Sequence, residues 1–295
     1  MLRAWKARTA IPGFNIPYLP MMAPVARALR DTRCFGLVMA ARLEWVKFAA
    51  GSPEAVFNEY QKVKDERFTR LHLDHVPVID EDSLLVDYGA ELGGAVALGY
   101  DSVMVDGSRL NLEENIAATR RIVELAHARG VAVEAELGAV MGHESGPMPP
   151  YEELFASGRG FTDPEEARRF VAETGVDWLS VAVGSVHGAI GAARREKKIE
   201  ARLSIERLDA IREAVNIPLV LHGGTGIRKD CVLESVRHGI AKINVATAIR
   251  QPYEALMDTD PEGALEAVHA ATVSVIRDDL ELENSADIIN PGGNA

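Results

Sequence analysis

The segment Thr69-Arg70-Leu71-His72-Leu73-Asp74-His75 is typical of a short β-strand that ends in a carboxylate next to an imidazole. A short apolar segment normally closes with a turn residue. Asp74 and His75 can instead hold a proton or a metal ion. Because such pairs also occur by chance in ordinary loops, the pair indicates a functional site only if other strands end in a similar way.

Two later segments share this feature. Val186-His187-Gly188 and Leu221-His222-Gly223-Gly224 each place a histidine at the expected end of a strand. Three strand ends therefore offer a possible metal ligand, provided that the fold brings them together.

Short apolar segments alternate with helical patterns along nearly the whole chain. The expected strands are residues 10–16, 34–40, 71–75, 102–106, 131–137, 178–183, 218–222 and 241–245. The expected helices are residues 21–30, 53–66, 83–98, 112–129, 163–175, 205–215, 229–238 and 253–257, with more helix beyond residue 261. Mainly apolar strands between helices indicate a parallel sheet. Eight such units predict one α/β domain over residues 1–295, a closed (β/α)8 TIM barrel with a C-terminal helical extension from about residue 251.

The composition limits the class of protein. Hydrophobic residues make up 47% of the chain and charged residues 26%, which is typical of a globular protein with a sizeable core. The net charge of −12 argues against nucleic acid or an anionic membrane as the main partner. Cys34 and Cys231 form neither a disulfide framework nor a C-x-x-C motif. Because the sequence also shows no signal peptide and no membrane-spanning stretch, we expect a cytoplasmic protein without a membrane partner.

The polar residues of the expected strands gather near the strand ends, where active sites of (β/α)8 barrels lie. They are Asp74, His75, Asp106, Glu134, Glu136, His187, His222 and Asn244. Two long βα loops follow the fifth and sixth strands, and loops of this length in a compact barrel often act as lids. They are residues 138–162, which contain His143 and Glu144, and residues 188–204, which contain Arg194, Arg195, Lys197 and Lys198.

The three strand-end histidines match an open catalytic zinc site. His75, His187 and His222 would be the protein ligands, and water or substrate would take the fourth position. A structural zinc site would need a closed set rich in cysteine, which this chain does not supply. Asp106 and Glu136 are candidates to support these ligands or to bind the metal in an alternate position.

The segment Gly223-Gly224-Thr225-Gly226 follows a strand and opens toward a helix. Exposed backbone N–H groups in such a loop can bind an anion, although glycines also serve plain tight turns. The position beside His222 and opposite residues 244–247 favours phosphate. The G-x-G-x-x-G fingerprint is absent after the first strand, so we expect neither a nicotinamide nor a flavin cofactor.

Taken together, these residues resemble the class II, zinc-dependent ketose-bisphosphate aldolase family, especially its fructose/tagatose-bisphosphate branch. The resemblance extends over roughly residues 10–250, in the order of the family's motifs. The matching segments are residues 13–15 (GFN), 72–75 (HLDH), 106–108 (DGS), 112–116 (LEENI), 133–138 (VEAELG), 184–188 (GSVHG), 221–226 (LHGGTG) and 242–247 (KINVAT). The last segment is similar to the tagatose-type version.

The resemblance implies a lyase that reversibly joins dihydroxyacetone phosphate to an aldehyde and that forms homodimers or homotetramers. Zinc acts as a Lewis acid on the ketone, so no Schiff base is needed. Asp74 matches the group that exchanges a proton with the aldehyde-derived hydroxyl, and Glu144 matches the acid/base for the C–H proton. The resemblance also implies a monovalent cation, Na⁺ or K⁺, near Val186, Gly188, Gly223 and Thr225. The residues that the resemblance assigns to substrate binding are Asn15, Gly188, Gly223, Gly224, Thr225, Asn244, Val245, Ala246 and Thr247.

The sequence departs from the family around the substrate. Residues 39–42 read Met-Ala-Ala-Arg where the family commonly offers serine to phosphate, and residues 76–78 read Val-Pro-Val where glycine is usual. Residues 189–191 read Ala-Ile-Gly after the histidine and glycine of the sixth strand. The proposed zinc and proton-transfer residues are retained, so these departures bear on the substrate more than on the reaction.

Two alternatives follow from these departures. One is an aldolase that acts on a deoxy-keto-sugar phosphate or on an unphosphorylated ketose. The other is an inactive relative that serves as a binding subunit, against which Asp74, Glu144 and the three histidines argue. A metal-dependent hydrolase is disfavoured because the first strand offers Asn15 and no histidine.

The basic residues 194–198 are a second candidate anion contact or a solvated lid surface.

Overall fold

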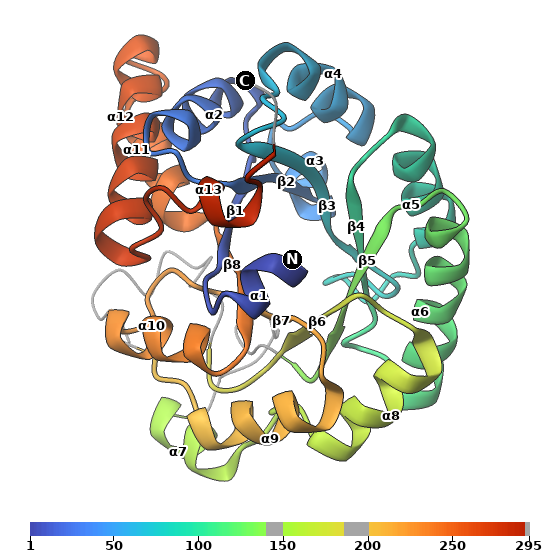
Figure 1. Cartoon of the computed structure of the whole chain (residues 1–295). Coiled ribbons are helices and arrows are strands. Elements are labelled where there is room, and N and C mark those ends of the chain that lie inside the picture. Colours follow the sequence, from blue (N-terminus) through green and yellow to red (C-terminus); the bar gives the residue numbers. More distant parts are fainter. Residues whose placement is uncertain (140–149, 186–200, 293–295) are drawn as a thin grey trace.

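A computed structural model describes residues 1–139, 150–185 and 201–292. It confirms the predicted (β/α)8 TIM barrel, in which eight parallel strands close a ring in sequence order, β1 pairing with β8 (Figure 1). The strands are β1 (Ile11–Asn15), β2 (Gly36–Ala41), β3 (Thr69–Pro77), β4 (Ser102–Asp106), β5 (Ala132–Leu137), β6 (Trp178–Val181), β7 (Leu219–Leu221) and β8 (Ile240–Val245).

Helices surround this ring. Those that follow the successive strands are α2 (Met22–Asp31), α4 (Pro53–Val63), α5 (Tyr88–Leu98), α6 (Leu112–His127), α8 (Pro164–Thr174), α9 (Ile205–Val215), α10 (Lys229–Arg237) and α11 (Thr247–Leu256). Further helical segments are α1 (Leu2–Lys6), η1 (Leu19–Met21), α3 (Arg42–Val46), α7 (Tyr151–Ser157), α12 (Pro261–Ser274), η3 (Val275–Asp279) and α13 (Ala286–Ile289). Within the described ranges, none of the helices is both long and apolar enough to cross a membrane.

Local sequence signals explain where several helices begin. Ser52 accepts a hydrogen bond from the N–H of Ala55 at the start of α4, and Pro53 occupies the first helical position. Asp163 accepts hydrogen bonds from two N–H groups at the start of α8. Such caps satisfy N–H groups that have no partner inside the helix.

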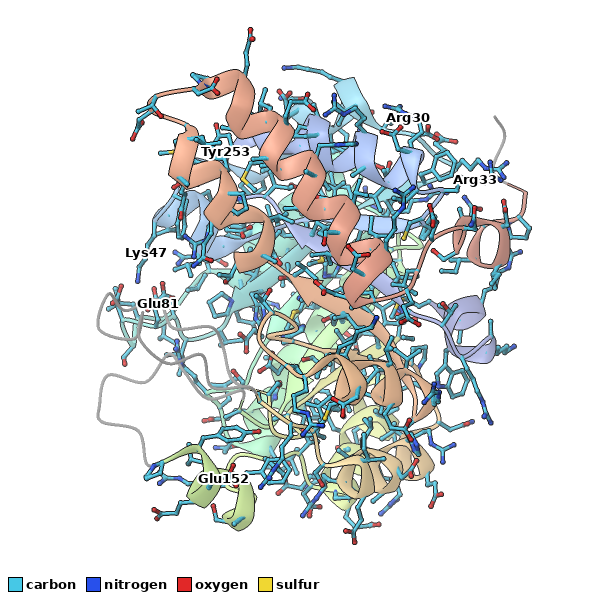
Figure 2. All side chains as sticks on the ribbon, turned by 90° about the vertical axis from the view of Figure 1, so that its left-hand side faces the viewer. Arg30, Arg33, Lys47, Glu81, Glu152 and Tyr253 are labelled. Atoms are coloured by element: carbon cyan, nitrogen blue, oxygen red, sulfur yellow. The ribbon has the colours of Figure 1, made fainter. Side chains whose placement is uncertain are left out.

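The C-terminal helices cover one side of the barrel. α12 packs against α11 and α2, so it closes the side formed by β1, β2 and β8 (Figures 1 and 2). Figure 2 faces this side and also shows Lys47, just after α3, beside Glu81 in the β3–α5 loop, with 2.9 Å between Nζ and Oε1.

The structure corrects some predicted helix bounds. The helix expected near residues 253–257 begins at Thr247 and contains Pro252 in its interior, and the helix expected from residue 83 begins at Tyr88. Residues before Tyr88 instead form a tight turn in which Ile79 and Leu85 form an antiparallel bridge. The short helices α3 and α7 lie in loops where the sequence analysis predicts none.

The interior of the barrel contains a polar layer below its mouth. His72, Glu134 and Lys242 are fully buried, each two residues before a polar residue at the end of the same strand. Because side chains alternate along a strand, residues two apart share a face. The fold therefore stacks an inner charged layer directly beneath the candidate site.

Candidate active site

The carboxyl ends of β1, β3, β4, β5, β7 and β8 bring most of the sequence-predicted site residues together. These residues are Asn15, Asp74, His75, Asp106, Glu136, His222 and Asn244. His187, Gly188, Glu144 and His143 lie outside the described residues, as do the basic residues 194–198. The described part of the site is therefore built from two histidines, four carboxylates and two asparagine amides, once Glu134 is included.

His75 occupies a distorted position in β3. The register between β3 and β4 shifts between Leu73 and Val76, and His75 has a φ of +33°. A β-bulge of this kind redirects a side chain and is common near active sites. It places His75 Nδ1 3.0 Å from Asp106 Oδ2 and 3.9 Å from Glu136 Oε2.

His222 lies between two carboxylates of β5. Its Nδ1 is 3.1 Å from Glu136 Oε2, and its Nε2 is 3.0 Å from Glu134 Oε1. The ring centroids of His222 and His75 are only 4.4 Å apart. Two imidazoles at this distance, surrounded by acids, form a pocket suited to a cation.

Asp74 on β3 is fixed by three donors on β1 and β8, which are not the neighbours of β3 in the ring. Asn15 Nδ2 donates to Asp74 Oδ2 at 3.0 Å, and Asn244 Nδ2 lies 3.2 Å from each Asp74 oxygen. Lys242 Nζ lies 3.6 Å from Oδ1, and the Asp74 side chain is buried. The carboxylate is thus held in one orientation at the mouth.

Glu134, Lys242 and His72 form an inner network that the sequence analysis did not assign. Lys242 Nζ is 2.6 Å from Glu134 Oε2 and 3.4 Å from His72 Nε2, while His72 Nδ1 is 2.8 Å from Ser102 Oγ. His72 is fully buried and in contact with this charged network. A sequence signal for this network existed, because each of the three residues lies two positions before a polar residue near the end of its strand and therefore shares its face.

The electrostatics of the pocket favour a bound cation. Burial alone would lower the pKa of His75, but the carboxylates of Asp74, Asp106 and Glu136 raise it to about 10. Burial and the positive charge of His75 lower the pKa of His222, yet Glu134 and Glu136 outweigh them and raise it. Carboxylates that stabilise the protonated form of an imidazole also stabilise a metal ion that replaces its proton.

The charges around the proposed acid/base Asp74 favour its ionised form. Burial alone favours its neutral form, but Lys242 and the nearby histidines hold its pKa well below the usual range. Burial likewise opposes the ionisation of Asp106, while His75 and Ser108 lower the pKa of this carboxyl. Both groups are therefore ionised at neutral pH.

Glu44, at the start of α3, is a second residue that the sequence analysis missed. It is buried, and its Oε2 accepts a hydrogen bond of 2.7 Å from the N–H of Ala41. Burial raises its pKa to about 8, against which the Ala41 N–H and the Asn15 amide act. A largely protonated carboxyl therefore lies beside Asn15, which itself holds Asp74.

The glycine-rich loop after β7 packs tightly against the end of β8. Gly223 has a φ of +70°, and a Cβ at Gly224 would lie 2.8 Å from the carbonyl oxygen of Asn244. The N–H of Gly224 donates to that same oxygen at 3.2 Å. The side-chain Oδ1 of Asn244 is buried and has no hydrogen-bond partner among the described residues. This oxygen is thus placed to receive a donor from a bound molecule.

Three groups of side chains in the described residues are close enough to bind a metal ion. They are Asp74–His75–His222, His75–Asp106–Glu136 and His72–Asp74–Glu134, with ligand atoms within 4.8 Å of one another in each group. The first two share His75 and open to the mouth. The third lies in the inner layer.

The chain is similar to known proteins over most of its length. The family model described as "Fructose-bisphosphate aldolase class-II" matches residues 1–287. The chain is 33% identical over 253 residues to the D-tagatose-1,6-bisphosphate aldolase subunit GatY of Klebsiella oxytoca, covering 85% of this chain and 80% of the relative.

Solved structures show the same fold. A protein from Coccidioides immitis proposed as a fructose-1,6-biphosphate aldolase superposes with a TM-score of 0.76 and 28% identity, over 97% of this chain and 96% of that one. The YdjI aldolase of Escherichia coli K12 superposes with a TM-score of 0.72 and 24% identity, over 96% and 95% of the two chains. At that identity the second likeness concerns the fold alone. The match over nearly the whole length shows that this chain belongs to the class II fructose-bisphosphate aldolase family and is a lyase of the aldolase type.

Proposed function

We propose that this protein is a zinc-dependent aldolase that reversibly cleaves a ketose phosphate to dihydroxyacetone phosphate and an aldehyde. The observation that carries the proposal is the pair His75 and His222, 4.4 Å apart between ring centroids and enclosed by carboxylates at the mouth of the barrel. Family membership supplies the reaction type.

The chemistry of the described donors fits zinc. His75 has a carboxylate on Nδ1, and His222 has one on each ring nitrogen. Such partners orient metal-binding imidazoles and raise their basicity. We assign His187, which lies outside the described residues, as the third ligand. Glu134, which contacts His222 and is anchored by Lys242, would orient the His222 ring beside the metal. Zinc held there supplies Lewis-acid polarisation of the substrate's ketone oxygen.

We assign Asp74 and Glu144 to the two proton transfers. In the cleavage direction, ionised Asp74 accepts the proton of the substrate hydroxyl that becomes the aldehyde as the carbon–carbon bond breaks. Glu144, outside the described residues, returns a proton to the carbon of the other fragment. The hydrogen bonds from Asn15 and Asn244 keep Asp74 aimed into the mouth.

The phosphate of dihydroxyacetone phosphate is assigned to the loops after β7 and β8. (β/α)8 barrels frequently bind phosphate at this place. α11 begins at Thr247 without a side-chain cap from Ala246, so its first N–H groups are suited to an anion. The proposed contacts are Gly188, Gly223, Gly224, Thr225 and residues 244–247, with Na⁺ or K⁺ nearby. A homodimer or homotetramer is proposed from the family resemblance.

The curated relative makes D-tagatose 1,6-bisphosphate the first substrate to test. A specific observation favours the alternative that the aldehyde half carries no phosphate. Where the family commonly offers serine to phosphate, this chain has Ala41 and Arg42, and Arg42 is engaged by Glu91 at 3.1 Å and Asp80 at 3.6 Å. Because these two acids neutralise Arg42, this rim offers little net positive charge to a second phosphate.

The test is a retro-aldol assay with controlled metal content. Protein stripped by a chelator and reloaded with zinc would be given a panel of ketose bisphosphates, ketose monophosphates and unphosphorylated ketoses. We expect dihydroxyacetone phosphate and a matching aldehyde to form only after reloading, and not with zinc-loaded Asp74→Ala. Full activity of metal-free protein, or no cleavage of any ketose, would contradict the proposal.

A further inference from the structure

The inner group formed by His72, Asp74 and Glu134 has the features of a metal site. All three side chains are buried, and their ligand atoms lie within 4.8 Å of one another. One imidazole with two carboxylates is a common donor set for divalent transition metals. On side-chain chemistry alone, this group would compete with the mouth for zinc.

The ammonium of Lys242 lies inside this group. Its Nζ is 2.6 Å from Glu134 Oε2, 3.4 Å from His72 Nε2 and 3.6 Å from Asp74 Oδ1. Lys242 has a relative solvent exposure of 0%, so its ammonium contacts these three side chains and no solvent. His72 Nδ1 contacts Ser102 Oγ, so Nε2 is the nitrogen that faces the ammonium.

We propose that Lys242 acts as an internal cation that occupies this second site and keeps a divalent metal out of it. The inference rests on the proposed function only in taking the mouth as the place of zinc. The ammonium supplies the positive charge that two buried carboxylates require, because unpaired buried charges are strongly destabilising. It is also covalently tethered, so its local concentration exceeds that of any free ion.

This occupation has a consequence for Asp74, which belongs to both the mouth group and the inner group. A metal in the inner site would bind Asp74 and remove it from proton transfer. Lys242 contacts Asp74 at 3.6 Å and leaves its oxygens to Asn15 and Asn244. The lysine thereby reserves Asp74 for the substrate.

The first test compares Lys242→Ala with Lys242→Leu. The alanine variant removes the cation and leaves space, whereas the leucine variant removes the cation and fills the space without adding a ligand. We expect Lys242→Ala to hold about one more zinc ion per chain than wild type, measured by mass spectrometry of metals after gel filtration, and Lys242→Leu to hold no more. Adding Glu134→Gln to Lys242→Ala should abolish the extra ion.

Each variant is also prepared with His75→Ala, which separates the two sites. Lys242→Ala/His75→Ala should retain the extra ion even if the mouth binds none, so a failure of the proposed function would leave this result intact. A folded Lys242→Ala protein with the zinc content of wild type would overturn the inference.

A second measurement needs no variant at position 242. Crystals of the full chain soaked in Cd²⁺ or Zn²⁺ should show anomalous density at the mouth and none among His72, Asp74 and Glu134. A peak within coordination distance of those three side chains would show that Lys242 does not exclude a metal, and would overturn the inference even if the substituted proteins did not fold.

Discussion

Asp106 lies 3.0 Å from Nδ1 of His75, and the backbone N–H and hydroxyl of Ser108 hold Asp106 in turn. This contact fixes the orientation of an imidazole whose backbone is strained. We therefore expect Asp106→Ala to weaken zinc binding by about 10- to 100-fold, because loss of such a partner commonly has an effect of this size. Competition with a chromophoric chelator would measure the dissociation constant.

Asp106→Asn is the matched control, since its side-chain oxygen can still accept a hydrogen bond from His75. It should weaken zinc binding less than Asp106→Ala. Equal zinc affinity in wild type and Asp106→Ala would show that the contact does not support the metal.

Asp74→Ala should separate proton transfer from metal binding. We expect the cleavage rate constant to fall by about 10²- to 10⁴-fold, the usual contribution of a positioned acid/base. The zinc content should stay at the wild-type level because His75 and His222 keep their partners Asp106 and Glu134. Steady-state kinetics and metal analysis on the same preparation would check both, and wild-type cleavage would remove Asp74 from its assigned role.

Zinc affinity should increase with pH in the neutral range. The carboxylates of Asp74, Asp106 and Glu136 outweigh burial and raise the pKa of His75 to about 10, so a metal must displace its proton. Each displaced proton should raise the affinity by about tenfold per pH unit between about pH 7 and 9. Calorimetry in buffers of different ionisation enthalpy would count the released protons, and a pH-independent affinity would argue against binding at His75.

Glu44→Gln should stabilise the protein at alkaline pH. Burial raises the pKa of Glu44 from 4.5 to about 8, so the folded state holds its proton more tightly than the unfolded state. Stability therefore falls as pH rises from about 4.5 to 8, by up to about 1.4 kcal/mol per pH unit. Glutamine can still accept the hydrogen bond from Ala41 and cannot ionise.

Thermal unfolding of zinc-free protein near pH 5 and near pH 8 would measure this effect. The melting temperature of Glu44→Gln should rise relative to wild type between the two values, whereas Glu124→Gln, on the exposed face of α6, should show no such trend. Parallel pH curves for wild type and Glu44→Gln would contradict the assignment.

The fold could be predicted from the sequence because each strand and most helices carry strong local signals. The expected helix at residues 205–215 matches α9, and caps such as Ser52 and Asp163 mark true helix starts. α11 was predicted too short because a proline usually disfavours a helix interior, yet Pro252 is tolerated there. The one-turn helix α3 was missed because it is too short to show a period.

The site could be predicted only in outline. Strand-end positions identified Asp74, His75 and His222, because the ends of parallel strands meet at one rim. The roles of Glu134 and Lys242 depend on contacts between β5 and β8, three strands apart in the ring, which no local pattern reveals. Glu44 was hidden because its burial results from the packing of α3 on β2 and β3.

The inner layer of Lys242, Glu134 and His72 also limits how this barrel can be redesigned. Replacing Lys242 leaves the carboxylates of Glu134 and Asp74 buried without this cation, so the charges of the layer depend on one another. The rim at Ala41 and Arg42 has no such dependence on the inner layer. Changes of substrate can therefore be sought by substituting single residues of the rim. The charges of the inner layer beneath would stay the same.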